Sequence, residues 1–472
     1  MDRGPVMVAR ATSHRGGAVP AFRNSVKRNS KSGKESRPRT QNPDDNESVI
    51  YTSGELLSDG TCIDLLQEAQ TGRLRLLLSD RNKCRMASEV AFRGSIYRPV
   101  NIHHSILQVI RLPSKWGHCE KTGELFTAVR ELFTSHGFPK HIALPTTYFS
   151  FATWFSRFLP VAPCLLIAGP RPEAMLLLEL LACLVRHPLP LGDISRSGLC
   201  SLPMHLELTL LIDQQGISRS TWGLLGGSNL LTANVPRKDG LVNIFCAKAV
   251  FCEETVYRGN FGDGTFQINI PPSRGRLPIL SATDKDEIVS VFQSRFLAYR
   301  AQNIYKVRDS QCDFPEFDSR IRILGRVLGA PIVDAPELQA DLIPLLRANQ
   351  AAIRASKLLD LRCVVIEALL LHCHEKSGEK LRVGQLTKNV NLILKGRGEI
   401  TEFTPESIGT ILRDQGFSPK RGSPGYGILL NESNRRFIHE LAIRFGVAAA
   451  QEGAGKCLHC AEMRASDESG SP

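Results

Sequence analysis

The stretch "CLLIAGPRPEAMLLLELLACLVRHP", residues 164–188, has the layout of a buried strand, a Gly-Pro turn and a long apolar helix. The uninterrupted apolar run before the turn is typical of a parallel strand that is covered on both faces. A helix that begins directly after such a strand often binds a nucleotide phosphate at its N-terminus. The stretch therefore predicts an α/β fold, and it raises the question of whether the turn still binds a phosphate.

The turn lacks the side chains that a phosphate-binding P-loop needs. In that motif, G-x-x-x-x-G-K-[S/T], backbone N–H groups surround the phosphates, the Lys reaches the terminal phosphates and the hydroxyl residue holds magnesium. Counted from Gly169, Ala174 replaces the second glycine, Met175 the lysine and Leu176 the hydroxyl residue. These changes oppose triphosphate binding. An ordinary core helix that never bound phosphate would show the same apolar side chains.

A second strand, "LTLLID" (208–213), ends in Asp213, where P-loop proteins place the acidic residue that holds magnesium through water. Gln214 follows at the position of a glutamate that often polarises the attacking water, and an amide cannot take the proton of that water. We assign Gly169, Pro170, Arg171, Asp213 and Gln214 to a degenerate nucleotide site without a catalytic residue. We expect Asp213 to end a strand that neighbours the one before Gly169. Attraction of an anion by Arg171 near the helix N-terminus is a lesser alternative.

Other segments place this unit in a layered fold. The segments "LVNIFCAKAVF" (241–251) and "FQINI" (266–270) have strand character, and strands separated by helices indicate a parallel sheet. From Thr283, the expected N-cap, to about residue 357 the pattern is helical. We therefore predict a P-loop NTPase-like α/β core with a helical lid.

Residues 356–446 have a pattern of their own. Three helical segments precede "FSPKRGSPGYGILLN" (417–431), which has the character of two short strands around a Gly/Pro loop. The third helix has Thr404 as its expected N-cap and Pro405 in its first turn, and it stops at Gly416. Three helices and a hairpin predict a winged-helix domain of mixed α and β structure, a relative of the helix-turn-helix.

Basic side chains of this domain are candidates for contacts with DNA phosphates. The predicted DNA-binding residues are Lys388, Lys395, Arg397, Arg413, Lys420 and Arg421. Phosphate contacts supply affinity without sequence information. The third helix, "PESIGTILRD", is poor in residues that read bases, so sequence-specific recognition is not expected. Protein docking and a purely structural role are the alternatives for this domain.

The predicted organisation has six parts. They are a disordered basic tail (1–50), an N-terminal mixed region (51–120), the P-loop NTPase-like core (121–282), a helical lid or linker (283–355), the winged-helix domain (356–446) and a disordered tail (447–472).

The overall charge favours an anionic partner. The 472 residues contain 59 Lys and Arg against 47 Asp and Glu, a net charge of +12. Such a charge attracts nucleic acid first and an acidic membrane surface second. Residues 1–47 are basic and nearly free of large apolar side chains, so they form either a solvated tail or an arm that lies along nucleic acid. We expect nucleic acid as the partner and no membrane contact.

The 13 cysteines are scattered, and several lie in apolar runs, which indicates free thiols in a reducing, cytoplasmic setting. The pair Cys457 and Cys460 has a spacing seen in zinc sites, but one pair is weak evidence because a structural zinc needs four ligands. His372 and His374 would point in different directions on a helix. No bound metal is therefore predicted.

Several short blocks resemble a family of bacterial P-loop ATPase-like proteins related to helicase and primase-helicase ATPases of mobile elements. The blocks are "IYRPVNIHHSILQVIRLPS", "GELFTAVRELF", "TYFSFATWFSRFLPVAPCLLIAGP", "RHPLPLGDIS", "LTLLIDQ", "FCAKAVF" and "LILKGRGE", between about Ser95 and Gly446. By this resemblance, an intact member would carry Gly-Ser-Gly-Lys-Thr at 172–176 and an acidic pair at 213–214. It would also carry an arginine finger before "FQINI", where "GDGTFQINI" has no Arg.

These three departures predict a pseudo-ATPase that serves as a DNA-associated scaffold in replication or maintenance of a mobile element. It would need no cofactor, and it could form a homo-oligomer or pair with an active ATPase relative. Two alternatives stay open. One is an active, helicase-like ATPase that uses ATP and magnesium with a non-consensus loop, and the other is a winged-helix transcriptional regulator.

Overall fold

The structure is a computed structural model of the whole chain. It describes residues 48–447 and Cys457, with gaps at 81–82, 119, 215–216, 238–239, 253–263, 274, 375–379 and 423–424. The chain divides into two units, Met1–Glu47 and Ser48–Pro472. The first unit lies outside the described residues, as does most of the predicted C-terminal tail. Among the described helices, none combines the length and apolar character that crossing a bilayer requires.

Two small sheets precede the parallel sheet. The first is antiparallel and has the order β2-β3-β4-β5, and the second has the order β1-β7-β6. Strand β1 begins inside the range that we assigned to the basic tail. The bounds are β1 Ser48–Thr52, β2 Gly54–Leu56, β3 Cys62–Gln67, β4 Leu74–Asp80, β5 Lys83–Ala87, β6 Val90–Phe92 and β7 Ser95–Pro99, followed by the short helix α1 His104–Leu107.

A five-stranded, fully parallel sheet forms the centre of the fold, in the order β14-β8-β13-β10-β9. The sequence predicted four of these strands and missed β9, whose residues "PLPL" have weak strand character. Proline is tolerated in β9 because it is an edge strand. The bounds are β8 Cys164–Ala168, β9 Pro188–Leu191, β10 Thr209–Asp213, β13 Ala247–Phe251 and β14 Thr265–Asn269. A separate hairpin is formed by β11 Asn234–Arg237 and β12 Gly240–Asn243.

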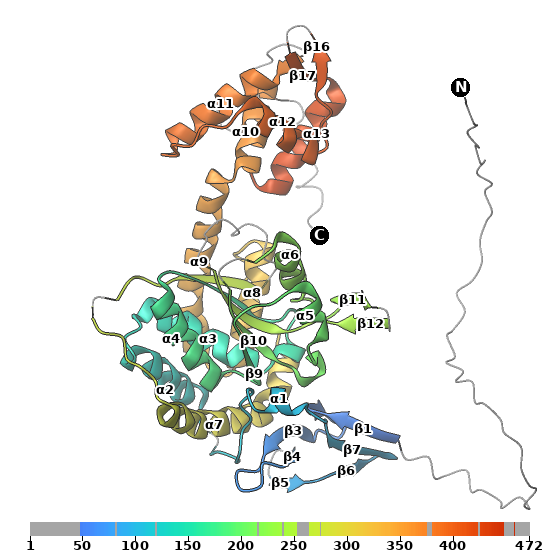
Figure 1. Cartoon of the computed structure of the whole chain (residues 1–472), viewed down its shortest axis with the longest axis vertical. Helices are drawn as coiled ribbons and strands as arrows, with labels where there is room; N and C mark the ends of the chain where they lie inside the picture. Colours follow the sequence, from blue (N-terminus) through green and yellow to red (C-terminus); the bar gives the residue numbers. More distant parts are fainter. Residues whose placement is uncertain are drawn as a thin grey trace, which may run out of the picture. The chain divides into compact units, whose positions relative to one another are not determined.

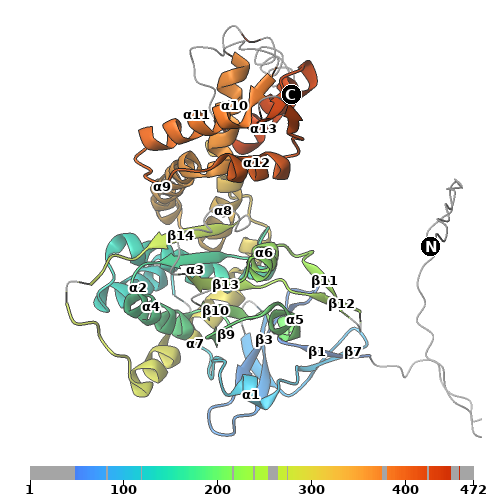
Figure 2. The ribbon, with the colours of Figure 1, turned by 45° about the horizontal axis from the view of Figure 1, so that its top comes forward.

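Helices cover both faces of the parallel sheet. In both ribbon views α2, α3 and α4 lie on one side of its strands, and α5 and α6 lie on the other (Figure 1, Figure 2). The helices are α2 Thr122–Ser135, α3 Lys140–Thr153, α4 Arg171–Leu184, α5 Arg196–Ser201, α6 Arg219–Gly227, α7 Ala282–Arg308, α8 Ser319–Gly329 and α9 Pro336–Leu359, with single 3-10 turns at Ser156–Phe158, Met204–Leu206 and Ala330–Ile332.

Successive residues of β8 belong to two different hydrophobic cores. Leu165 and Ile167 pack with residues of α2, α3, α4, α7 and α8. Cys164 and Leu166 pack with residues of α5, α6 and the small antiparallel sheet. Side chains alternate between the two faces of a strand, so the apolar run at 164–168 is covered on both faces, as predicted.

Helix α7 begins two residues earlier than expected. Its N-cap is Ser281, not Thr283: Ser281 accepts a hydrogen bond from the Asp284 N–H, and Asp284 accepts one from the Ser281 N–H. This reciprocal arrangement is a capping box, and it satisfies two N–H groups at the helix start. α7 packs against α4 within one hydrophobic core.

Residues 361–445 form a smaller α and β module with its own core. Helices α10, α11 and α12 are followed by a hairpin, and a three-residue strand that the sequence did not indicate completes an antiparallel sheet of order β15-β17-β16. Thr404 caps α12 as predicted. The bounds are α10 Leu361–His374, β15 Lys380–Arg382, α11 Val383–Gly396, α12 Pro405–Asp414, β16 Lys420–Gly422, β17 Gly425–Leu429 and α13 Glu432–Phe445.

Four charged side chains form a buried cluster that joins the small antiparallel sheet to the parallel sheet and α7. Asp64 on β3 lies 2.6 Å from Arg186, which follows α4, and 2.9 Å from Arg300 on α7. Glu207, just before β10, accepts a hydrogen bond from Arg186 Nε at 3.1 Å. The side chains of Asp64, Arg186 and Arg300 are each 2% exposed. Although burial opposes ionisation, the two guanidinium groups keep the pKa of the Asp64 carboxyl below its usual range.

We expect Asp64→Asn to lower the free energy of unfolding by about 3–5 kcal/mol, because it leaves two buried arginines without an ionised partner on β3. Urea denaturation followed by tryptophan fluorescence measures this loss. The matched control is Glu89→Gln at the exposed Arg98–Glu89 pair, where we expect a loss below about 1 kcal/mol. Equal effects of the two substitutions would contradict a central role for the buried cluster.

Candidate nucleotide site and terminal module

The turn between β8 and α4 consists of only two residues, Gly169 and Pro170. Helix α4 begins at Arg171, so the positions that would carry a P-loop glycine, lysine and hydroxyl lie within the helix. Ala174 and Leu176 at these positions are buried in the core. A P-loop needs several residues of non-helical backbone whose N–H groups point at the phosphates. This turn is too short to form such a loop.

Packing explains why residue 169 is a glycine. Its φ of 134° lies in a region of backbone conformation that residues other than glycine rarely adopt. A Cβ atom at this position would overlap the carbonyl oxygen of Ile270, which follows β14. The Ile270 N–H donates to the Ala168 carbonyl at 2.8 Å, which holds the two strand ends together. Gly169 therefore has a structural role at the carboxyl edge of the sheet.

Arg171 and Asp213 meet at this edge. Arg171 Nη2 lies 2.6 Å from Asp213 Oδ2, and their side chains are 43% and 20% exposed. Our expectation that Asp213 ends a strand adjacent to β8 is wrong, because β13 lies between β8 and β10. The Arg171 side chain is long enough to span that extra strand. Its guanidinium supplies a positive charge directly beside the Asp213 carboxylate.

A buried acid stands at the N-terminus of α4. Glu173 is in the first turn of the helix and is 8% exposed. Its Oε1 accepts a hydrogen bond from the Ser273 N–H at 2.6 Å, in the segment after β14. A carboxylate at this place interacts favourably with the positive end of the helix dipole. It would also repel an incoming phosphate.

The Gln214 side chain is hydrogen-bonded to the neighbouring backbone. Its Oε1 accepts a hydrogen bond from the Ile194 N–H at 3.1 Å, in the segment between β9 and α5. The amide thus fixes the loop that follows β9. Of the five residues assigned to the degenerate site, the structure brings Arg171 and Asp213 into direct contact, and Gly169 and Pro170 form the turn beside them.

The residues predicted to contact DNA are not equivalent. Lys388 and Lys395 are exposed on α11, and because they are seven residues apart they share one face of the helix. Arg397 is half-buried: its Nη2 lies 2.7 Å from each carboxylate oxygen of Glu367, and its Nη1 donates to the Leu358 carbonyl. This bidentate pair makes Arg397 part of the internal packing.

The remaining three basic residues are exposed. Lys420 and Arg421 lie on β16 of the hairpin, and Arg413 lies on the last turn of α12. Arg413 donates a hydrogen bond to Thr410 Oγ1 at 3.1 Å, a neighbour on the same helix. Helix α12 carries Glu406 in its first turn, so its N-terminal end is acidic.

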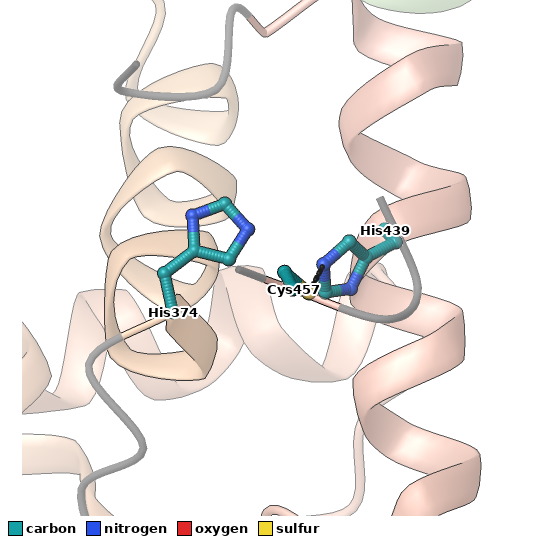
Figure 3. A group of neighbouring side chains, drawn as sticks. All are labelled: His374, His439 and Cys457. Carbon is teal, nitrogen blue, oxygen red and sulfur yellow. Dashed lines mark hydrogen bonds between the residues drawn. The ribbon is translucent and has the colours of Figure 1, made fainter. Parts of the chain in front are cut away.

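A cluster that the sequence did not predict lies in the terminal module. His374 at the end of α10, His439 on α13 and Cys457 offer ligand atoms that are all within 4.8 Å of one another (Figure 3). The expected divergence of the two α10 histidines is confirmed: His372 Nε2 instead pairs with the Asn389 amide at 2.9 Å. His439 was missed because it lies 65 residues after His374 and has no spacing motif. Cys460 lies outside the described residues.

No protein-family model and no curated protein sequence matches the chain. Solved structures with some likeness include the A-form apo structure of the NrS-1 C-terminal region, at 12% identity, with 78% of this chain and 96% of that chain covered and a TM-score of 0.31. They also include Drosophila ORC bound to DNA (12%, 70% and 95%, TM-score 0.19) and Cdc6p from Pyrobaculum aerophilum (12%, 64% and 93%, TM-score 0.17). With TM-scores below 0.5, these likenesses decide neither fold nor function.

We expect Gly169→Ala to destabilise the protein by about 1–3 kcal/mol, because it combines an unfavourable φ with a clash against Ile270. Thermal denaturation measures the loss. The matched control is Gly223→Ala on the exposed face of α6, where a Cβ would meet nothing within 4 Å. There we expect a gain of up to about 1 kcal/mol from helix propensity. A neutral Gly169→Ala would show that the turn is free to rearrange.

Proposed function

We propose that this protein is a P-loop-ATPase-like scaffold that does not hydrolyse nucleotide and that associates with nucleic acid. The observation that carries the proposal is the carboxyl edge of the parallel sheet. In open α/β sheets, ligands bind in the crevice outside the carboxyl ends of the strands. Here the two-residue turn of Gly169 and Pro170 and the Arg171–Asp213 ion pair occupy that place.

The charges at this edge favour a structural role for these residues over nucleotide binding. A nucleotide site needs donors for the phosphates and an acid that holds hydrated magnesium. Arg171 is paired with the acid, and Glu173 places a buried carboxylate at the helix N-terminus. ATP with magnesium would have to break the first pair and overcome the charge of the second group. We therefore infer that the chain needs no nucleotide.

The terminal module supports the nucleic-acid part of the proposal. Its order of helix, short strand, two helices and a hairpin supports the assignment of a winged-helix domain, in which α12 would be the recognition helix and β16–β17 the wing. Lys388, Lys395, Lys420 and Arg421 give its exposed surface positive charge. Contacts to phosphates by such residues bind nucleic acid without reading its sequence. A scaffold of this kind would hold nucleic acid for an active ATPase relative or for further copies of itself.

The first test is catalytic. The full chain with ATP and magnesium, with and without DNA, should release no phosphate above the blank in a malachite-green assay, because the β8–α4 turn is too short for a phosphate loop and Asp213 is paired with Arg171. Asp213→Ala should leave this result unchanged. An ATPase with an intact P-loop serves as the positive control. Turnover by the full chain that Asp213→Ala abolishes would instead establish the active-ATPase alternative.

The second test concerns nucleic acid. The double variants Lys388→Ala/Lys395→Ala and Lys420→Ala/Arg421→Ala should weaken binding to unrelated DNA sequences alike. Each should make the negative slope of log K against log salt shallower by about 1 for every phosphate that the protein no longer neutralises. Fluorescence anisotropy over a salt series measures both quantities. The control Lys83→Ala/Arg85→Ala removes the same charge from exposed positions of β5. An equal weakening in the control would place the DNA-binding surface outside the terminal module.

A further inference from the structure

Three cations lie on the solvent face of the small sheet in the terminal module. Arg382 on β15 and Lys420 on β16 flank Gly427 of the central strand β17. Lys380 on β15 pairs with Leu429, further along β17. Cross-strand partners point to the same face of a sheet, as do alternate residues of one strand, so Lys380, Arg382 and Lys420 share a face. All three are exposed, and none of the residues in β15, β16 and β17 is acidic.

The opposite face of this sheet packs on the core of the module. Ile428 on β17 and its partner Leu381 on β15 are buried in that core. Arg421 pairs with Tyr426, which alternates with Gly427 along the strand and therefore points to the same side as Ile428. The two basic neighbours on β16, Lys420 and Arg421, thus point to opposite faces of the sheet.

Two glycines let the Lys380 side chain lie flat across the solvent face. A Cβ atom at Gly427 would lie 3.2 Å from Lys380 Cε, and one at Gly422 would overlap Lys380 Nζ. The Lys380 ammonium group therefore lies over β16, the strand that carries Lys420. Within the part of the chain that the structure describes, Lys380, Arg382 and Lys420 have no side-chain hydrogen bond or ion pair. Unpaired like charges that share one face attract an anion to it.

Helix α12 offers a less favourable surface for phosphates. Its exposed charged residues are Glu406, Arg413 and Asp414, so carboxylates outnumber cations. Arg413 also donates a hydrogen bond to Thr410 Oγ1 on the same helix. The carboxylates repel phosphates, whereas the cations of the sheet face attract them. The distribution of charge in the module therefore favours the sheet over the helix as the place where an anionic polymer binds.

The sheet face is better suited to nucleic acid than to a membrane. Leu429, which is 49% exposed, is the single large apolar side chain that the three strands present on this face. Binding to a bilayer surface needs buried apolar area in addition to positive charge. Binding to a phosphate backbone needs positive charge and room for close approach, and glycines in a strand leave such room.

We propose that the phosphodiester backbone of nucleic acid binds across the solvent face of this sheet, to Lys380, Arg382 and Lys420, and not to α12. Contacts of this kind supply affinity and read no bases. The inference rests on the proposed association with nucleic acid and assigns that association to one surface. It adds Lys380 and Arg382 to the residues predicted from the sequence, and it separates Lys420 from Arg421.

Removal of charge from this face of the full chain tests the proposal. The variant Lys380→Gln/Arg382→Gln/Lys420→Gln should weaken binding to duplex DNA of unrelated sequences alike. It should also make the negative slope of log K against log salt shallower by about 2–3, because up to three phosphate contacts are lost. Fluorescence anisotropy over a salt series measures both quantities. The thermal midpoint should stay unchanged, since the three side chains are exposed, and this separates lost contacts from misfolding.

Matched controls locate the surface. Arg421→Gln removes the neighbouring charge of β16 that points to the other face, and Arg413→Gln removes the cation of α12. Each should leave the affinity within about twofold and the salt slope unchanged. The variant Arg73→Gln/Lys83→Gln/Arg85→Gln removes the same total charge from exposed positions of the N-terminal antiparallel sheet and should also have little effect.

The outcomes distinguish this proposal from the proposed association with nucleic acid. DNA binding that the triple variant on the terminal sheet leaves unchanged would overturn the sheet surface alone. Equal weakening by Arg413→Gln would overturn it as well, because α12 would then share the contact. Absence of DNA binding by the unaltered chain would overturn both proposals. A triple variant that keeps DNA binding but no longer binds vesicles of phosphatidylserine would assign this face to a membrane instead.

Discussion

The structure depends most on a balanced group of four charges in its interior. Asp64 and Glu207 face Arg186 and Arg300, and these residues come from a strand of the antiparallel sheet, two connections of the parallel sheet and the long helix α7. Each charge was costly to remove from water, so none is tolerated there without its partners. The cluster consequently fixes how these elements pack against one another. The apolar cores on either side supply most of the buried surface. Apolar contacts, however, specify the relative placement of strands and helices less strictly than buried charge pairs do.

Charges are also matched within the chain at the candidate nucleotide site, which is more exposed. At the carboxyl edge of the parallel sheet the chain supplies its own cation, Arg171, for the acid at the end of β10, and its own anion, Glu173, for the start of α4. In an active P-loop enzyme, a bound magnesium nucleotide supplies both charges. The layered fold persists because its stability comes from the strands and their covering helices, which do not require a bound phosphate.

The sequence predicted the elements with strong local signals. The apolar runs of β8, β10, β13 and β14 and the cap at Thr404 were predictable because burial and capping leave marks on neighbouring residues. Strand β9 has prolines that mask its character, and the order of strands depends on long-range packing. The Arg171–Asp213 pair was missed for the same reason, since the partners are 42 residues apart. Likewise, His374 and His439 become neighbours only through the packing of α10 on α13.

The short turn at Gly169 and Pro170 makes a phosphate-binding loop difficult to introduce at this place. Exchanging Met175 for lysine would place an ammonium group more than one helical turn inside α4, at a position that packs against the hydrophobic core. A phosphate-binding loop would require extra backbone between strand and helix, together with release of Gly169 from its close contact with Ile270. Single substitutions can therefore reshape the side chains at this edge of the sheet, whereas only an insertion could create room for a phosphate-binding loop.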